Sequence, residues 1–511
     1  MLLSHLLAKA QIPGPAGADP DITGIADNSA HVQPGHIFVA IKGYRFDGNE
    51  FIPDALARGA AAVVTEREMT LPVPVIAVAD ARIALAQLCN AWHDFPGQAM
   101  TVIGVTASNG KTTTSFMIDS ILSRYYGRTG LIGTVIVKDG RNAFSADLTT
   151  PGARELYQWL GAMRDHGCSH VTMEVSSAGL ELHRVHGIDF DIAAFNNVTR
   201  EHIDFHGSFE KYWQQKSKLI RNLSAQAVAV LNGDEEKIRN LAGQTRADVV
   251  TYSLKGNPAD ILIKDVDLST GAARFNYIVP KNYAGRRHSL TAASLAVRLK
   301  VLGLHNVYNA AAAITVAKLC GVPDEHIIDA LADFTGVERR FQLIYDRDFK
   351  IIDDHFANAG NIDITLETLG LMQYNRLHLV IAIRGSRGST VNAENAHAVA
   401  RWASKLPLAG VIITDSVEFT GERDRVSDEE RSVFLGILAE AGIKYVYYPK
   451  LTDAIEHVLK EAETDDVILL GGCQGMDHAA HVIIPKVARR HAPDEQKEIL
   501  KILENRVAGS S

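Results

Sequence analysis

The sequence has only four cysteines in 511 residues, and no two of them form a CxxC pair. A chain held together by disulfides, or one built around a zinc site of paired cysteines, would carry more cysteines at short, regular spacings. We therefore expect Cys89, Cys168, Cys320 and Cys473 to be reduced thiols, as is usual for a protein of the cytoplasm.

Long apolar runs and an excess of basic charge are also missing. No stretch approaches the ~18 apolar residues that cross a bilayer, and Lys9 interrupts the short apolar start before it resembles a signal peptide. The formal net charge of −8 argues against nucleic acid and anionic membranes as partners, because both attract basic surfaces. A small anionic substrate in a local basic pocket remains compatible with this charge, and the oligomeric state is left open.

What the sequence does have is the alternation of an α/β protein. Hydrophobic residues make up 46% and charged residues 22% of the chain, which is the balance of a globular protein, and the length indicates two to four domains. Short β-branched apolar runs alternate with helical patterns, which predicts largely parallel sheets. The first strands are expected at residues 36–40, 61–65 and 75–78, before a turn at residues 95–97.

Two further blocks follow the same plan. The second ends in a predicted helix at residues 306–320, and the third starts near Arg340 with the spacing of a doubly wound, nucleotide-binding-like domain. The expected strands of the second block lie at residues 100–106, 171–175, 192–195 and 227–231. Those of the third lie at residues 350–353, 379–383, 411–414, 445–448 and 467–470.

The strongest local signal is a phosphate loop between a predicted strand and a predicted helix. Backbone N–H groups and a helix N-terminus in this arrangement surround a polyphosphate; Lys111 would neutralise β/γ oxygens and the Thr112 hydroxyl would hold Mg²⁺. The strict GxxxxGK[ST] pattern is not met, because Val105 stands where its first glycine is expected. The strand-to-helix context still favours ATP over an ordinary turn. The expected ATP contacts of the loop are Ser108, Asn109, Gly110, Lys111, Thr112 and Thr113.

This loop and several further blocks resemble the Mur ligase family. The loop is similar to the family's GTNGKT sequence, and the segment at residues 24–43 is similar to its N-terminal domain. The other matching blocks are LTTPGA at 148–153, MEVSSAGLELHRV at 173–185, NNVTREHIDFHG at 196–207, YWQQKSKL at 212–219 and HNVYNA at 305–310. These ordered motifs cover nearly the whole chain and are most similar to the tripeptide-forming branch of the family.

The resemblance implies an ATP-dependent ligase of three domains, at residues 1–98, 99–338 and 339–511. An N-terminal domain would hold the distal part of a carboxylate substrate, which can be UDP-linked, and a central P-loop domain would bind ATP. A Rossmann-like C-terminal domain would bring an amine or amino acid. In such a ligase the carboxylate attacks the γ-phosphate of ATP to give an acyl phosphate and ADP, and the amine then displaces phosphate to form the amide.

The charge gathered at such a site requires metal ions beside Lys111. Glu174 ends a predicted strand and suits Mg²⁺ together with Thr112, and His202, after the next strand, would reach a second ion. In the family, the lysine that matches Lys216 in its YxxxK spacing is carbamylated by CO₂, which turns a cation into an anionic metal ligand. The alternative for Lys216 is a solvated helix lysine, the commonest environment of that residue.

The resemblance also implies substrate contacts. The expected acyl-substrate contacts are Ser29, Thr149, Thr150, Ser176 and Arg184, with Ser29 near the uridine end. The further ATP contacts are Asn306 and Asn309, which match the NxxN that meets adenine, and Arg340 and Asp354, which match residues that close over the nucleotide. For each of them, an ordinary role in a cap, a turn or the surface is the alternative.

The C-terminal part departs most from the family pattern. The DNPR segment that recognises diaminopimelate is DSVEF at residues 415–419, and GKGHE is replaced by GGCQGMD at 471–477. An amine pocket that loses such partners leaves buried charges unpaired, so its ligand must change. The loop IRGSRG places Arg384 and Arg387 after a strand, where they would grip an anionic group or serve a structural or nucleotide-closing role. We expect amine contacts from Arg384, Arg387 and Asp415.

Smaller departures lie nearer the carboxylate and the nucleotide. Ala107 replaces a glycine of GTNGKT, Ala178 replaces the histidine of MEVSSH, and Ala30 replaces the arginine of DSR near the uridine site. The DYAHxP segment has the sequence DHFANA at residues 354–359.

Three functions remain open from the sequence. The full-length N-terminal domain favours a ligase of peptidoglycan precursors. The altered amine segment favours a Mur-type ligase that acts in a natural-product, storage-polymer or coenzyme pathway. The third is a non-catalytic nucleotide-binding protein, but a chain of that kind has no need of Lys111, Glu174, His202 and Lys216 together.

Overall fold

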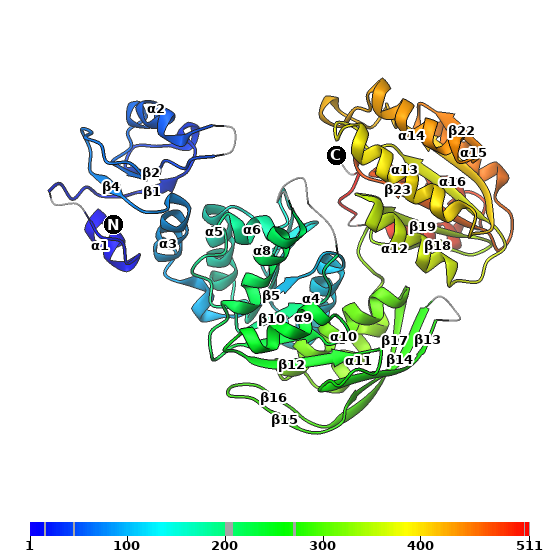
Figure 1. The fold of residues 1–511 in the computed structure, drawn as a ribbon, viewed down its shortest axis with the longest axis horizontal. Coiled ribbons are helices and arrows are strands. Elements are labelled where there is room, and N and C mark those ends of the chain that lie inside the picture. Colours follow the sequence, from blue (N-terminus) through cyan, green and yellow to red (C-terminus); the bar gives the residue numbers. More distant parts are fainter. Residues whose placement is uncertain (15–16, 44–45, 200–207, 269–271, 505, 510–511) are drawn as a thin grey trace.

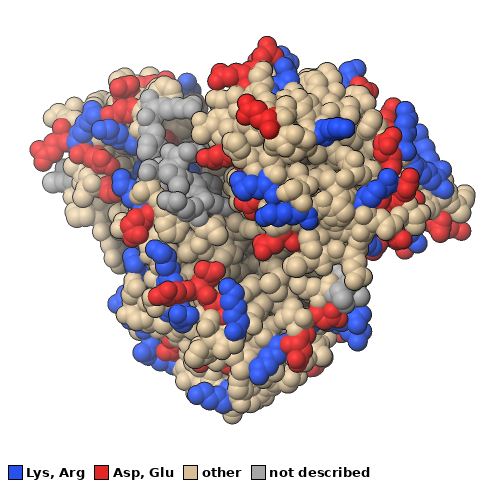
Figure 2. Space-filling model, turned by 45° about the vertical axis from the view of Figure 1, so that its right-hand side comes forward, with Lys and Arg blue, Asp and Glu red and all other residues tan. Residues whose placement is uncertain are grey.

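The computed structural model describes residues 1–14, 17–43, 46–199, 208–268, 272–504 and 506–509. The chain passes through three units built on sheets, from the N-terminal unit at the left of Figure 1, through a large central unit, to the C-terminal unit at the upper right. The predicted α/β class is confirmed. In the part of the chain that the structure describes, no helix has the length and apolarity to cross a membrane. On the face drawn in Figure 2, acidic and basic side chains are interspersed.

The N-terminal unit is a four-stranded parallel sheet with the order β1-β2-β3-β4. The three strands predicted here are confirmed within a few residues, whereas the short β1 was not predicted. Its strands are β1 (Gly24–Ala26), β2 (His36–Val39), β3 (Ala62–Thr65) and β4 (Val75–Ala77). Its helices are α1 (Leu3–Lys9), α2 (Ile52–Ala57) and α3 (Ala81–Trp92). Asp80 caps α3, because its side chain accepts from the N–H groups of Arg82 and Ile83.

The central unit is built on an eleven-stranded sheet. The predicted strands are confirmed as β5 (Thr101–Thr106), β9 (His170–Glu174), β10 (Ile192–Phe195) and β11 (Val228–Asn232), and all four run parallel to one another. They are buried on both faces, which explains their unbroken apolar sequences. Seven strands of this sheet were not predicted. They are β6 (Thr129–Ile132), β7 (Ile136–Lys138), β8 (Ala143–Ser145), β12 (Asp248–Ser253), β13 (Ile261–Asp267), β14 (Ala272–Val279) and β17 (Ala293–Leu302).

The helices of the central unit cover the two faces of this sheet. They are α4 (Lys111–Tyr126), α5 (Ala153–Asp165), α6 (Ser177–Glu181), α8 (Phe209–Arg221), α9 (Glu236–Arg239), α10 (Leu304–Leu319) and α11 (Asp324–Asp333). The predicted helix at residues 306–320 corresponds to α10, but α11 follows it, so α10 does not end the unit. α4 and α10 pack against each other through small and apolar side chains, which brings Asn309 to the start of α4.

The C-terminal unit has a six-stranded sheet with the order β18-β19-β23-β20-β21-β22. Its strands are β18 (Gln342–Asp346), β19 (Lys350–His355), β20 (Leu377–Ala382), β21 (Leu408–Thr414), β22 (Tyr445–Tyr448) and β23 (Val467–Gly472). All except the antiparallel β18 were predicted. Its helices are α12 (Ala359–Gly370), α13 (Ser389–Ala403), α14 (Asp428–Glu440), α15 (Leu451–Glu461), α16 (Ala479–Ala488) and α17 (Pro493–Leu500). Because β23 lies between β19 and β20, the carboxyl ends of these strands form the crevice where doubly wound sheets bind ligands.

A buried ion cluster holds the start of this unit to the end of the chain. Asp353, which is fully buried, contacts the guanidinium groups of Arg339 and Arg506. Arg506 also donates to Gln342 Oε1 at 2.9 Å, and Arg339 donates to the carbonyl of Cys473 at 2.9 Å. Asp477 also pairs with Arg339, whereas Asp353 is the carboxylate that pairs with the buried Arg506.

Replacing Asp353 with Asn should destabilise the C-terminal unit by about 3–5 kcal/mol, because the guanidinium group of Arg506 would stay buried without its carboxylate and Arg339 would keep only Asp477. Chemical denaturation followed by circular dichroism would measure this loss. The matched control is Asp346→Asn, which removes an exposed pair with Lys350 and should cost no more than about 0.5 kcal/mol. Equal losses in the two variants would contradict the role of the cluster.

Candidate active site

The phosphate loop connects the end of β5 to the start of α4. Gly110 stands before the helix with a φ of +83°, and a Cβ at this position would lie 2.3 Å from Asn309 Oδ1. Only glycine fits both the left-handed backbone and this close approach. The first N–H groups of α4 therefore open directly toward the space above the loop, as anion binding at a helix start requires.

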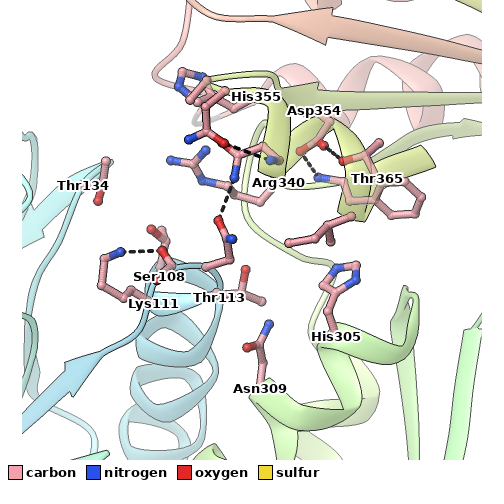
Figure 3. A pocket seen from close by; sticks show the side chains of 18 of the residues that line it. Ser108, Lys111, Thr113, Thr134, His305, Asn309, Arg340, Asp354, His355 and Thr365 are labelled. Atoms are coloured by element: carbon pink, nitrogen blue, oxygen red, sulfur yellow. Dashed lines mark hydrogen bonds between the residues drawn. The ribbon is translucent and has the colours of Figure 1, made fainter. Parts of the chain in front are cut away.

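That space is a cavity of about 240 Å³ between the central and the C-terminal units (Figure 3). All six residues predicted for the ATP loop line it. Asn309, Arg340 and Asp354, which come from other elements, line it as well. The Lys111 ammonium lies over the loop, where it donates to the carbonyl oxygens of Ala107 and Ser108, both at 2.9 Å.

A buried carboxylate lies beside the start of α4. Glu174, at the end of β9, is fully buried and accepts from the hydroxyl of Thr112 at 3.0 Å. Thr134 also donates to it, from its N–H at 2.8 Å and from its hydroxyl at 2.9 Å. A carboxylate next to a hydroxyl at a phosphate loop fits Mg²⁺, which binds one or two carboxylates and completes its shell with phosphate oxygens and water. Thr112 and Glu174 would hold that ion.

Among the residues described, no group of three His, Cys, Asp or Glu side chains surrounds a single point that could hold a metal. His202, the predicted ligand of a second ion, lies outside the described residues. Its role stays a prediction.

Lys216 lies directly beneath the phosphate loop. Its side chain is 1% exposed, and its Nζ donates to the carbonyl of Ala107 at 2.6 Å. The ring of Tyr212 lies 5.1 Å from the ammonium, and the Tyr212 hydroxyl lies 2.9 Å from Ser108 Oγ. The alternative of a solvated helix lysine is therefore wrong. Its carbamylation stays a prediction.

Four of the predicted acyl-substrate residues lie on one side of Glu174. Thr150 Oγ1 lies 2.9 Å from the Glu174 carbonyl and accepts from the Ser176 N–H at 3.0 Å. Arg184 donates to the Thr150 carbonyl at 2.7 Å. Thr149 borders the cavity, and its hydroxyl oxygen lies 3.1 Å from the Thr134 hydroxyl oxygen, within hydrogen-bond distance. These contacts connect the predicted carboxylate site to the predicted metal site.

Ser29, the fifth predicted acyl-substrate residue, lies elsewhere. It is buried in the N-terminal unit, where its hydroxyl bonds to Asp54 and lowers the pKa of that carboxyl. It does not line the cavity.

Asn306 and Asn309 lie next to each other on α10. Asn309 donates to Asn306 Oδ1 at 2.9 Å and accepts from the Thr114 hydroxyl at 3.2 Å. Asn306 donates to the Leu302 carbonyl at 2.8 Å and is not part of the cavity lining. Of the pair, Asn309 faces the loop, whereas Asn306 holds Asn309 in place; the adenine contact stays a prediction for both.

The C-terminal unit contributes the opposite wall of the cavity. Asp354 accepts from the Phe341 N–H at 2.9 Å and from the Thr365 hydroxyl, and burial raises its pKa. Burial, together with Arg340, Arg339 and Arg384, lowers the pKa of His355 well below its usual value. Arg339 and Phe341 have positive φ values of 57° and 50°, so the chain bends sharply on both sides of Arg340 at the cavity edge.

The three predicted amine contacts do not converge on this cavity. Arg384 donates to the carbonyl of Ala357, a lining residue, and Arg387 is exposed. Asp415 is 1% exposed, and its Oδ2 accepts from Arg431 Nε at 2.7 Å and from the Tyr447 hydroxyl at 2.8 Å. Their role in binding the amine stays a prediction.

Several residues at the site escaped the sequence analysis. Thr134 follows a strand that has no motif, so nothing in the sequence marked it. His305 and Phe341 line the cavity as an edge-to-face pair with ring centroids 6.0 Å apart, and burial lowers the pKa of His305 to about 4. His305 stands in a block that matches the family and could have been found there. Phe341 comes next to a predicted contact but carries no signal of its own.

Comparison with known proteins finds three matching domain families in order along the chain. The catalytic domain of the Mur ligase family matches residues 21–93, the Mur ligase middle domain matches residues 105–317, and the glutamate ligase domain matches residues 339–474.

Relatives and solved structures give the same result. The UDP-N-acetylmuramoyl-L-alanyl-D-glutamate–2,6-diaminopimelate ligase of Geobacillus thermodenitrificans is 33% identical over 485 residues, which cover 92% of this chain and 94% of that protein. The ligase of the same name from Bacillus velezensis is 34% identical over 466 residues, which cover 89% of each. The MurF ligase of Thermotoga maritima in complex with ADP has the same fold, with a TM-score of 0.61 at 22% identity over 91% of this chain and 98% of that one.

These relatives confirm the predicted three-domain architecture and the predicted enzyme class, an ATP-dependent ligase that forms amide bonds and uses Mg²⁺. The boundaries expected at residues 98 and 338 stay a prediction. With a relative 33% identical over nearly the full length of both chains, the chain belongs to the Mur ligase family.

Proposed function

We propose that the chain joins the carboxylate of a UDP-linked muramoyl dipeptide to an amine other than meso-diaminopimelate. The observation that carries the proposal is the hydrogen-bonded group of Thr112, Glu174, Thr134 and Thr149, which connects the phosphate loop to the acyl residues. A carboxylate held on this side of Glu174 would meet the γ-phosphate of ATP. The names of the relatives, which describe a muramoyl dipeptide as substrate, support this class of carboxylate.

The phosphoryl transfer depends on positive groups arranged before the substrates arrive. Lys111 and the N–H groups at the start of α4 stabilise charge on the transferring group. Thr112 and Glu174 would hold Mg²⁺, which would further neutralise the phosphate oxygens. Thr149, Thr150, Ser176 and Arg184 orient the attacking carboxylate.

Burial supports a catalytic role for Lys216. Lys216 is 1% exposed, and its Nζ lies 2.6 Å from the carbonyl oxygen of Ala107 in the phosphate loop. It is therefore not a surface charge, and it lies close enough to influence the loop. Addition of CO₂ to its neutral amine releases a proton and gives an anionic carbamate. That anion would serve as a ligand of the second Mg²⁺, the ion for which His202 is also a predicted ligand.

The amine would approach from the C-terminal unit, but its pocket has changed. Asp415 already pairs with Arg431, and Glu418 accepts from the N–H and the hydroxyl of Thr452 at 2.9 and 3.1 Å. Both carboxylates therefore already have partners within the protein, so neither is available to pair with an ammonium group of a diamino acid. Residues 415–419 also contain no arginine that could pair with its carboxylate. Arg384 and Arg387 are the candidate contacts for a group of different charge.

The altered pocket also supports the second candidate, a ligase that acts on a non-muramyl carboxylate in another pathway. The N-terminal unit, with Ser29 near the expected uridine end, favours the UDP-linked substrate. We place the reaction in the cytoplasm, where ATP is supplied and thiols remain reduced.

Replacing Lys111 with Ala should lower kcat by about 100- to 1,000-fold, the usual cost of one group that stabilises a transition state. The fold should persist, because the lysine contributes little to the core. ADP release measured with the dipeptide substrate and a panel of amines would test this. Lys255→Ala, an exposed lysine of the same unit, is the control, and a Lys111→Ala enzyme with the turnover of that control would contradict the loop assignment.

Lys216→Ala should lose at least about 100-fold in activity, the upper end of what weakened support of a metal site costs. Formate or acetate should restore part of the rate, because a free carboxylate can replace the carbamate. Lys211→Ala, on the exposed side of the same helix, should keep the wild-type activity, and formate or acetate should not alter its rate. Carbamylation would be refuted by an intact mass and a ¹³CO₂ NMR spectrum that show no adduct on the active wild-type enzyme.

The proposed change of amine predicts negligible activity with meso-diaminopimelate. Its kcat/KM should fall about 100-fold or more below that of the best amine in the panel, because a charged partner of the amino acid is missing. Lysine should also be poor. The measurement is amide formation with UDP-N-acetylmuramoyl-L-alanyl-D-glutamate as carboxylate. Efficient use of diaminopimelate would return the chain to ordinary cell-wall synthesis, whereas no product with any amine would favour the non-muramyl carboxylate.

A further inference from the structure

Two asparagines join the C-terminal unit to the phosphate loop. Asn361, on the first turn of α12, donates from Nδ2 to Asn109 Oδ1 at 2.6 Å. Both side chains line the cavity. The bond therefore crosses from one wall of the proposed nucleotide site to the other.

The position of Asn109 is fixed from the central unit. Asn197, just beyond β10, accepts from the Asn109 N–H at 2.9 Å and donates to the Asn109 carbonyl at 2.8 Å. These two bonds fix the backbone and leave the side chain to be oriented by its own partner. With Oδ1 bound to Asn361, the buried Nδ2 has no hydrogen-bond partner among the described residues, so it is left to donate to a ligand atom beside the loop.

The position of Asn361 is fixed from the C-terminal unit. Asn358 caps α12, and its Oδ1 accepts from the Asn361 N–H at 3.0 Å. Arg384 donates to the carbonyl of Ala357 in the same turn. This turn overlaps the segment at residues 354–359 in which the sequence departs from the family's DYAHxP pattern. The replaced segment thus supplies a rigid helix start that faces the loop.

We propose that Asn361 is a positioning residue, which orients the Asn109 amide toward the nucleotide and holds the C-terminal unit over the phosphate loop. The proposal rests on the proposed function, since it assumes that the cavity binds ATP. The bond exists only when the two units face each other. Any nucleotide that prefers this arrangement is therefore linked to the bond, and each strengthens the other.

Nucleotide affinity tests the proposal without any acceptor amine. A non-hydrolysable ATP analogue with a methylene bridge would be titrated with Mg²⁺ into the wild type, Asn361→Ala, Asn109→Ala and the double variant. Loss of one hydrogen bond between neutral groups should raise the Kd of Asn361→Ala by about 5- to 10-fold. In the double variant the Asn361 substitution should add less than about 2-fold, because its partner is already gone.

Asn375→Ala is the matched control, because the Asn375 side chain donates to the Thr464 carbonyl at 3.1 Å, within the C-terminal unit. Asn375→Ala should have the same Kd as the wild type, and all variants should have the same Tm as the wild type. Small-angle scattering should show compaction on analogue binding in the wild type and less in Asn361→Ala.

An unchanged Kd in Asn361→Ala, or effects of Asn361 and Asn109 that multiply in the double variant, would overturn the positioning role alone. A wild type that does not bind the analogue would instead overturn the proposed function.

Discussion

The carboxylate of Glu174 is buried at the end of β9, where three hydrogen bonds from two threonines converge on it. Thr112 brings the start of α4 to this point, and Thr134 brings Thr149 and the acyl side. A buried carboxylate is costly unless each of its oxygens is satisfied, so the surrounding loops are constrained to deliver their donors here. The phosphate loop, the acyl residues and the proposed metal site all take their relative positions from this one group.

The central unit alone forms only half of the cavity. Arg340 and Asp354 come from the other side, after a chain segment that bends at two residues with positive φ. An acyl phosphate is destroyed by water, so a site that is assembled from two units can exclude solvent at the moment the intermediate forms. The contact between Asn361 and Asn109 gives this assembly a specific hydrogen bond rather than a loose apposition of surfaces.

The sequence predicted most of the parallel strands and the phosphate loop, because buried strands have unbroken apolar runs and the loop has a motif. The parallel strands β1, β6 and β12 were missed. The sequence analysis also missed β13, β14 and β17, which form an antiparallel arm. In these strands buried residues alternate with exposed, often charged ones, so their sequences lack unbroken apolar runs. Contacts such as those of Thr134 and Asn361 depend on which turns meet in three dimensions, and no local pattern carries that information. The amine site remained the least determined part, because Asp415 is used by Arg431, a partner 16 residues away on another element.

The place of β23 in the C-terminal sheet has a consequence for how the chain folds. Residues 467–472 fill the gap between β19 and β20, so the centre of the sheet is completed only after β20, β21 and β22 have been synthesised. Until then the inner edges of β19 and β20 stay open, and pairing must bridge a long sequence separation, which slows folding. In a newly made chain, the N-terminal and central units would therefore fold first. The chain would become a competent ligase only after β23 pairs with β19 and β20.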